Sequence, residues 1–293
     1  EQFYILWAFL FSTFNLSKIK KIIFLLLILC IFTSYILPLI SVNIEGKKYI
    51  LDNPKIILPA KKKIYLIGDS TMANNGNNPN AIGWGVAFPS YCDTTRIEII
   101  NKARGGRSSR TFTNEGLWDA VKKELKSGDF VLIQFGHNDA GAIDKEKFRG
   151  SLKGIGDETQ EVVRDSLTET VHTFGWYMGN FIKETKEKGA IPIVLSQTPR
   201  NEWPNDKVER RSETYCLWSK EAASKGGAFY VDINENIALK YEQLGKEKVK
   251  TFFPKDHTHT GIEGATFNAL TIAESLKNLG KTGLEDYIIL PKK

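Results

Sequence analysis

The sequence predicts an α/β fold in which helices cover a parallel sheet. Short apolar runs rich in β-branched residues recur along the chain, and helical patterns separate them. Each run stops at a glycine or at small polar residues, as buried parallel strands do where they enter a loop. At 293 residues with 42% hydrophobic content, the chain can bury the core of one good-sized α/β domain.

The first strand is expected at residues 64–67, Ile-Tyr-Leu-Ile, and it stops at Gly68. Asp69 and Ser70 follow directly. Open α/β sheets bind their ligands beyond the carboxyl ends of the strands, so Ser70 is expected to project into a crevice. An isolated Gly-Asp-Ser tripeptide is better explained as a turn, so this interpretation depends on residues further along the chain.

Four more strands and six helices are expected after this one. The strands are residues 97–100, 130–134, 191–195 and 228–231. The helices are residues 83–91, 117–126, 168–188, 212–225, 237–244 and 263–279. A polar, glycine-containing insertion at 140–160 follows the third strand and is long enough to have a function of its own.

The N-terminal segment carries a targeting pattern. Lys18, Lys20 and Lys21 precede an unbroken apolar run at 22–32, which is the pattern of a secretory signal peptide. The alternative is a membrane anchor, because residues 22–40 are nearly long enough to span a bilayer. We expect export to the periplasm or the extracellular space, and contact with a membrane only through an uncleaved leader.

These patterns divide the chain into four parts. They are a leader at 1–43, a lead-in at 44–62, a folded domain at 63–285 and a tail at 286–293. A second apolar stretch within residues 1–16 fits an upstream extension of the reading frame.

Charge and cysteine content narrow the function classes. The formal net charge of +6 is spread along the chain, which suits an acidic polymer, and no concentrated basic tract predicts nucleic-acid binding. The three cysteines include no CxxC pair, so a cysteine zinc site is not expected. Cys30 lies in the leader, and Cys92 and Cys216 fit either one disulfide or two buried thiols.

A candidate site residue follows each of the first four expected strands. Ser70, Gly106, Asn138 and Arg200 come after them in that order. The carboxyl ends of parallel strands share one sheet edge, so these residues are expected to converge there. If the strand order is 2-1-3-4-5, the first and third strands are neighbours, and Ser70 lies beside Asn138.

A nucleophilic serine needs a base, and the segment after the last strand offers one. Asp256 lies three residues before His259, close enough in a turn to accept from the imidazole Nδ1–H and leave Nε2 free for the Ser70 proton. The same imidazole then activates water for deacylation. His257 and His259 also resemble a metal pair, but no cluster of ligand spacing completes it.

Three donors are available for a developing oxyanion. They are the backbone N–H groups of Ser70 and Gly106 and the side-chain amide of Asn138. Glycine permits the close backbone approach that such a donor needs. There is no Gly-x-Ser-x-Gly, which counts against an ordinary α/β-hydrolase nucleophile turn.

Further side chains are candidates for substrate contact. Arg107, Arg110 and Arg200 at the crevice edge suit bidentate contacts to carboxylates, although holding a loop through backbone carbonyls is the default role for any one of them. His137 is another candidate, with a structural role as the default. Candidate sugar-stacking platforms are Trp84, Trp176 and Trp203, although a core position is the default for any one of them.

Together these motifs resemble the SGNH, or GDSL-type, hydrolase superfamily. The matching blocks are Gly68-Asp69-Ser70, Gly106, Gly136-His137-Asn138-Asp139 and Asp256-x-x-His259. Residues 101–112, 133–139, 197–203 and 256–264 closely resemble rhamnogalacturonan acetylesterases, a carbohydrate-esterase family. The similarity covers about residues 63–279.

The resemblance implies a flavodoxin-like three-layer α/β/α sandwich with a five-stranded parallel sheet, and a catalytic domain at 63–285. It also implies a serine esterase without metal or other cofactor, which removes acetyl groups from galacturonosyl residues of the rhamnogalacturonan backbone of pectin. Separately, we expect the protein to be a monomer. Ser70 is then the nucleophile, His259 the base and Asp256 its orienting acid. The oxyanion hole comprises Ser70, Gly106 and Asn138.

Two other functions stay open. Within the enzymes, the alternative is an acetylesterase for another acetylated glycan such as xylan, or a broad small-ester hydrolase. Outside them, the alternative is a catalytically silent sugar-binding module on the same fold. The intact set of blocks disfavours that module.

Overall fold

The computed structural model describes residues 41–44, 47–50 and 61–291, except 77, 146 and 165. The chain forms two compact units, residues 1–60 and 61–293. In the first unit, β1 (Ser41–Ile44) and β2 (Lys47–Ile50) pair as an antiparallel hairpin, which the sequence did not predict. Nearly all of the expected leader at 1–43 lies outside the described residues.

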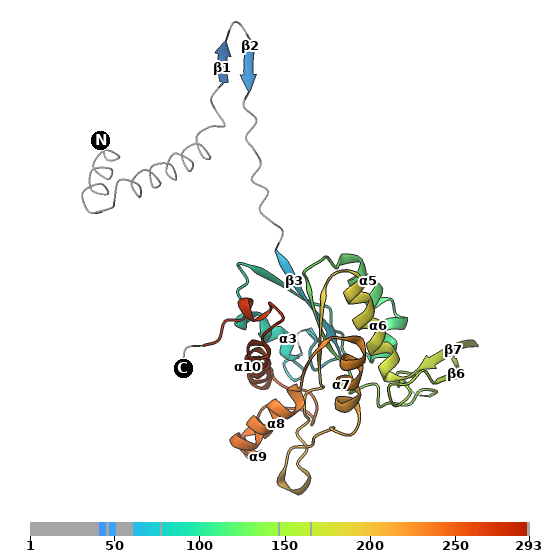
Figure 1. Ribbon diagram of the computed structural model, residues 1–293. Helices are drawn as coiled ribbons and strands as arrows, with labels where there is room; N and C mark the ends of the chain where they lie inside the picture. Colours follow the sequence, from blue (N-terminus) through green and yellow to red (C-terminus); the bar gives the residue numbers. More distant parts are fainter. Residues whose placement is uncertain are drawn as a thin grey trace. The chain divides into compact units, whose positions relative to one another are not determined.

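The second unit contains the expected five-stranded parallel sheet (Figure 1). Its strands are β3 (Lys62–Gly68), β4 (Ile97–Asn101), β5 (Phe130–Gln134), β8 (Ile191–Leu195) and β9 (Phe229–Val231). Their order is β4-β3-β5-β8-β9, and every neighbouring pair is parallel. This is the order 2-1-3-4-5, so the first and third strands adjoin as predicted, with Gly68 opposite Gln134.

Helices cover both faces of this sheet and confirm the three-layer α/β/α sandwich. One face carries α3 (Trp84–Ala87), α8 (Ile233–Leu244) and α10 (Ile262–Leu279). The other carries α4 (Ser109–Asn114), α5 (Leu117–Glu124), α6 (Phe174–Glu187) and α7 (Tyr215–Gly226). The shorter elements are α9 (Lys246–Lys250) and 3-10 turns at Phe88–Tyr91, Pro204–Asp206 and Glu285–Tyr287.

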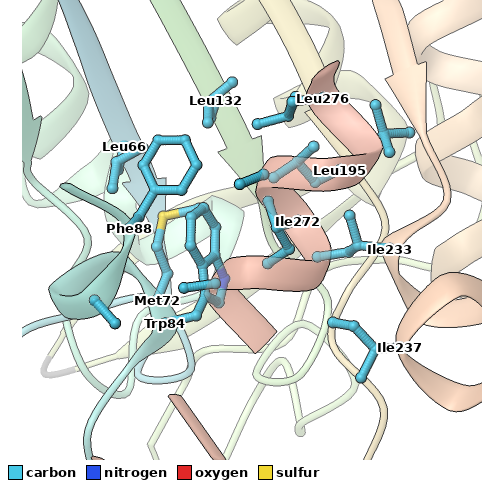
Figure 2. Packing of buried hydrophobic residues seen from close by; sticks show 14 of the residues in the cluster. Leu66, Met72, Trp84, Phe88, Leu132, Leu195, Ile233, Ile237, Ile272 and Leu276 are labelled. Carbon is cyan, nitrogen blue, oxygen red and sulfur yellow. The ribbon is translucent and has the colours of Figure 1, made fainter. Parts of the chain in front are cut away.

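Alternation along the strands divides the core into two layers. In β3, Leu66 packs towards the α10 face and Ile67 towards the α6 face, both fully buried. Figure 2 shows the first layer, in which Leu132 and Leu195 from the sheet lie near Leu276 of α10. Large apolar side chains on both faces hold the carboxyl ends of the strands in a fixed array.

Cys92 and Cys216 are separate free thiols. Cys92 lies in the core layer that includes α10, whereas Cys216 is buried on α7. The disulfide interpretation is therefore wrong for this structure, and the interpretation as two buried thiols is correct.

The helix predicted at 168–188 begins six residues late. Residues 159–164 and 167–172 form an antiparallel hairpin, β6 (Thr159–Arg164) and β7 (Leu167–His172), which lies beyond the end of α6 in Figure 1. The alternating β-branched residues of β7 favour a strand. Thr173 then caps α6, because its hydroxyl accepts from the Trp176 N–H at 3.1 Å.

Arg110 fastens this hairpin and the preceding insertion to the domain. Its side chain is fully buried and forms an ion pair with Glu169 of β7 at 2.6 Å. Nη1 also donates to the carbonyls of Ile143 at 2.9 Å and Gly150 at 2.8 Å. The expectation that Arg110 lies at the crevice edge is wrong, because all of its donors face the interior.

Packed structure continues past the expected domain end at 285. Ile288 is buried in the core layer that includes α10, and the Ile289 N–H donates to the Tyr91 carbonyl at 2.9 Å. The first half of the expected tail at 286–293 is therefore part of the domain. No helix among the described residues is long and apolar enough to cross a membrane.

Candidate active site

Ser70 stands in a tight turn at the carboxyl end of β3. The N–H groups of Met72 and Ala73 donate to the Asp69 carbonyl at 3.2 and 3.0 Å, which turns the chain directly after the strand. Gly68 is required here because a Cβ at this position would lie 2.6 Å from the Gln134 carbonyl oxygen of β5. The hydroxyl of Ser70 is thereby presented at the sheet edge.

The structure brings Ser70, His259 and Asp256 into one hydrogen-bonded chain. Ser70 Oγ lies 2.9 Å from His259 Nε2, and His259 Nδ1 lies 2.8 Å from Asp256 Oδ2. Asp256 Oδ1 accepts from the backbone N–H groups of Thr258 at 2.7 Å and His259 at 2.8 Å, so the turn itself fixes the carboxylate. The arrangement matches the order nucleophile, base and orienting acid.

The charge on Asp256 sets the tautomer of the imidazole. Partial burial would raise the pKa of Asp256, but hydrogen bonds from His259 and Thr258 outweigh it and lower the pKa to about 2. The ionised carboxylate can only accept, so the proton of the neutral ring resides on Nδ1. The lone pair on Nε2 then faces the Ser70 hydroxyl and accepts from it.

Two loops hold the histidine segment in place. Ile82 and Thr260 are joined by two bonds of 2.8 Å, one between their backbones and one from the Thr260 hydroxyl to the Ile82 carbonyl. The Asn201 N–H of the loop after β8 donates to the His257 carbonyl at 2.8 Å. His257 Nε2 faces Glu202 at 3.3 Å, away from the triad. No three metal-ligating side chains gather anywhere in the described ranges.

The glycine pair after β4 lies against the serine turn. Asn75 Nδ2 donates to the carbonyls of Ser70 at 2.9 Å and Ala81 at 2.8 Å. A Cβ on Gly105 would come within 2.6 Å of Asn75 Oδ1, so only glycine allows this approach. Gly106 has φ +76°, a left-handed conformation that glycine adopts without strain.

Two backbone N–H groups and one side-chain N–H, in the turns after β3, β4 and β5, have no acceptor among the described residues. Among the described residues, none supplies an acceptor for the N–H group of Ser70 or that of Gly106. Asn138 Nδ2 donates to the Arg107 carbonyl at 2.8 Å. A primary amide carries two N–H bonds, so the second is available while the first fixes its direction.

A cavity of about 310 Å³ opens beside the triad. It is lined by Ser70, Asn75, Asn78, Asn80, Ala81, Gly105, Gly106, Lys255, Asp256 and His259. This volume is at the lower end of the range for small-molecule sites and suits a unit of about one sugar. Amide side chains from one loop line it, which favours a ligand rich in hydroxyl groups.

Two buried carboxyl groups beneath the site were not predicted. Asp69 Oδ1 accepts from the N–H and hydroxyl of Thr71 at 2.9 and 2.8 Å, and burial raises its pKa to about 6. Asp139 accepts from the Ser109 hydroxyl, from the Ser109 N–H at 3.1 Å and from the Gly136 N–H at 3.1 Å. Burial, opposed by these bonds and assisted by the charge of Asp69, raises the Asp139 pKa to about 7.

Asp139 therefore ties the start of α4 to the turn that carries Asn138. The only sequence signal for this role was that Asp139 directly follows Asn138 in the block Gly136–Asp139. The sequence alone did not show that Ser109, a residue 30 positions away, supplies the donors.

The candidate substrate contacts mostly serve the scaffold. Arg107 donates to Glu115 at 3.0 Å and to the Gly105 carbonyl at 3.0 Å, so it holds the glycine loop. Arg200 is largely buried and approaches Glu202 at 3.9 Å. His137 is buried, its Nε2 lies 3.3 Å from the Thr198 hydroxyl, and burial beside the Arg200 charge holds its pKa well below the usual value.

Trp84 is a core residue, so its expected role as a sugar platform is wrong. Its side chain is fully buried, donates from Nε1 to Gln134 Oε1 at 2.7 Å and packs edge-on against Phe88. Figure 2 shows it beside Met72 inside the apolar layer. Trp203 packs partly against the same core, and Trp176 stacks on His172 with ring centroids 3.7 Å apart.

Comparison with known proteins gives a consistent result. The family model described as GDSL-like Lipase/Acylhydrolase matches residues 64–270. The chain is 40% identical over 203 residues to "Rhamnogalacturonan acetylesterase" of Emericella nidulans, covering 69% of this chain and 80% of that protein. It is 31% identical over 222 residues to "Probable rhamnogalacturonan acetylesterase YesY" of Bacillus subtilis, covering 74% and 93%.

A solved structure shares the fold. The crystal structure of a Bacillus subtilis protein, YxiM, superposes with a TM-score of 0.62 at 24% identity. The match covers 76% of this chain and 58% of that one.

Proposed function

Because this chain belongs to the GDSL-like lipase/acylhydrolase family and is a carboxylic ester hydrolase, we propose that its substrate is acetylated pectin. It removes O-acetyl groups from galacturonosyl residues of the rhamnogalacturonan backbone. The substrate class is supported by the two relatives named rhamnogalacturonan acetylesterases, which this chain matches over most of their length. The polar, amide-lined cavity beside Ser70 is consistent with a carbohydrate.

The observation that carries the mechanism is the 2.9 Å contact between Ser70 Oγ and His259 Nε2. Ser70 Oγ attacks the acetyl carbonyl carbon while Nε2 takes the hydroxyl proton, and Asp256 stabilises the imidazolium. The tetrahedral intermediate collapses when His259 returns the proton to the departing sugar oxygen. An acetyl-enzyme and a free sugar hydroxyl result.

Deacylation repeats the same proton movements with water. His259 Nε2 takes a proton from water, and the resulting hydroxide adds to the acetyl carbon on Ser70. Collapse breaks the bond to Ser70 Oγ, which recovers its proton from His259. Acetate leaves, and the enzyme returns to its starting state.

The free donors around the nucleophile form the oxyanion hole in this mechanism. The N–H groups of Ser70 and Gly106 and the second N–H of Asn138 donate to the carbonyl oxygen as its negative charge develops. The bond from Asn138 to the Arg107 carbonyl holds the amide in position before substrate arrives, so little reorganisation is needed.

The substrate also supports a proposed location. Pectin is an extracellular polymer too large to enter a cell, so an enzyme acting on it is exported or displayed outside. Three lysines before the apolar run 22–32, Lys18, Lys20 and Lys21, are consistent with a leader that directs export.

The decisive experiment measures acetate release from three substrates by wild-type enzyme and by Ser70→Ala. They are acetylated rhamnogalacturonan, acetylated xylan and 4-nitrophenyl acetate. The proposal requires the highest kcat/KM on rhamnogalacturonan and no release by the variant. A preference for xylan, or equal rates on all three, would contradict the proposed substrate.

A further inference from the structure

The cavity beside Ser70 contains a positive charge that the triad does not use. Among the described residues that line the cavity, Lys255 is the one lysine or arginine. It directly precedes Asp256 in the chain. Its side chain is exposed and has no hydrogen-bond or ion-pair partner among the described residues. The ammonium group is therefore free to meet a ligand within the cavity.

The three arginines that the sequence suggested for carboxylate contacts do not reach the cavity. Arg107 is held by Glu115 and the Gly105 carbonyl, and Arg110 is buried against Glu169. Arg200 is largely buried and does not line the cavity. Arg107 and Arg110 therefore have the loop-holding role expected by default, and Lys255 is the lysine that lines the cavity.

We propose that Lys255 binds the carboxylate of the galacturonosyl residue whose acetyl group is cleaved, and so selects acidic over neutral sugars. This inference rests on the proposed function. One sugar ring carries both the acetyl ester and the carboxylate, so a ring whose acetyl carbon lies at Ser70 places its carboxylate within the same small cavity. Ser70, His259 and Lys255 all border that cavity.

A lysine suits a substrate whose carboxylate takes up slightly different positions in the cavity from one sugar of the polymer to the next. Its ammonium is a compact charge with three donors on a flexible stem, and it follows a carboxylate without demanding one planar geometry. Because the side chain is exposed, the attraction is moderate and screened by salt. It therefore acts through the affinity for acidic substrate rather than through the bond-breaking steps.

The test compares acetylated rhamnogalacturonan oligosaccharides with the same oligosaccharides after methyl esterification of their carboxylates. The readout is the ratio of kcat/KM for acetate release from the two forms at low salt. Three variants are assayed: Lys255→Gln, Lys255→Arg and Lys188→Gln. Lys188 is an exposed lysine at the C-terminal end of α6, just before β8 begins at the opposite edge of the sheet.

In Lys255→Gln the ratio is expected to fall roughly threefold to tenfold, mainly through a higher KM for the acidic form. Lys255→Arg retains most of the ratio because it keeps the charge, and Lys188→Gln keeps the wild-type ratio. The wild-type ratio also falls at high salt. A wild-type ratio in Lys255→Gln overturns the inference.

The outcome separates this inference from the proposed function. If wild-type enzyme hydrolyses 4-nitrophenyl acetate but releases no acetate from the acidic oligosaccharides, the proposed substrate is wrong and the role of Lys255 falls with it. If wild-type enzyme releases acetate and Lys255→Gln discriminates equally well, only the inference fails.

Discussion

Ser70 Oγ and His259 Nε2 lie 2.9 Å apart although 189 positions separate the two residues in the chain. Ser70 follows the first strand of the central sheet, and His259 precedes the last long helix, α10. The contact exists because the histidine segment is bonded to the loop after β8 and to Ile82. The reactive pair thus depends on the whole domain being folded.

Replacing either member of this pair is expected to lower kcat by about 10⁴-fold or more, because proton transfer and nucleophilic attack are one event. Ser70→Ala, His259→Ala and the double variant are compared by acetate release from 4-nitrophenyl acetate. The double variant falls no further than each single one. A single variant that keeps a tenth of the wild-type kcat, with an unchanged melting temperature, would disprove the mechanism.

Asp256→Asn is expected to lower kcat by about 10⁴-fold while leaving the backbone turn intact. The amide oxygen still accepts from Thr258, but the amide N–H₂ faces His259 Nδ1 and favours the wrong tautomer. The measurement is kcat at neutral pH. Glu202→Gln is the matched control, since Glu202 contacts the outward-facing His257 and the variant should keep wild-type kcat.

Asn138→Ala removes one proposed oxyanion donor and is expected to lower kcat by about 10²–10³-fold with little change in KM. Steady-state kinetics on 4-nitrophenyl acetate resolves the two constants. Asn278→Ala, an exposed amide near the end of α10, serves as the control. The oxyanion role would be refuted by a rise in KM at undiminished kcat.

Trp84→Phe is expected to act on stability and not on substrate binding. It removes the bond to Gln134 and part of a fully buried side chain, so the free energy of unfolding should fall by about 1–3 kcal/mol. Urea unfolding measures this loss. Trp176→Phe, at a partly exposed position, should cost less. A raised KM in Trp84→Phe without destabilisation would restore the sugar-platform interpretation.

Asp69→Asn is expected to flatten the pH dependence of stability. The folded-state pKa of Asp69 is raised from its ordinary value of 3.8 to about 6, because the carboxyl is buried. Folded protein then binds this proton more tightly than unfolded protein, so stability falls as pH rises from about 4 through 6.

The amide in Asp69→Asn keeps both bonds from Thr71 and replaces an oxygen that has no partner among the described residues. The variant should therefore melt a few degrees higher than wild type at pH 8, and the two should converge near pH 4. Thermal unfolding across this range is the measurement. Asp93→Asn, a surface change, should leave the slope between pH 5 and 8 unaltered. A lower melting temperature of Asp69→Asn at pH 8 would contradict the expectation.

The sheet was predictable because its strands are continuous apolar runs that stop at glycine or polar residues. Residues 64–67 and 130–134 carry that signal unambiguously, and their adjacency follows from the known order of such sheets. The sequence predicts a helix over residues 168–172 because the helical pattern of residues 174–187 can be continued towards the N-terminus through them. The pairing of these residues with β6 is a non-local contact that local propensity does not report.

The hydrogen-bonded chain of Ser70, His259 and Asp256 was predictable because Asp256 and His259 are close in sequence and Ser70 directly follows a strand. The burial and the partners of individual side chains could not be predicted from the sequence. Nothing in the sequence distinguishes Trp84, whose N–H finds Gln134 inside the core, from a tryptophan at the surface. Likewise, nothing in the sequence shows that Arg110 is buried against Glu169 whereas Lys255 lines the cavity.

The inward-facing guanidinium of Arg110 limits how this enzyme can be re-engineered. Exchanging loops between related enzymes is one way to alter specificity, and residues 140–172 form a continuous segment that could be chosen for such an exchange. Removing this segment would leave the buried guanidinium of Arg110 without hydrogen-bond acceptors, because Ile143, Gly150 and Glu169 supply them. A folded chimera must therefore take α4 and residues 140–172 from the same parent protein.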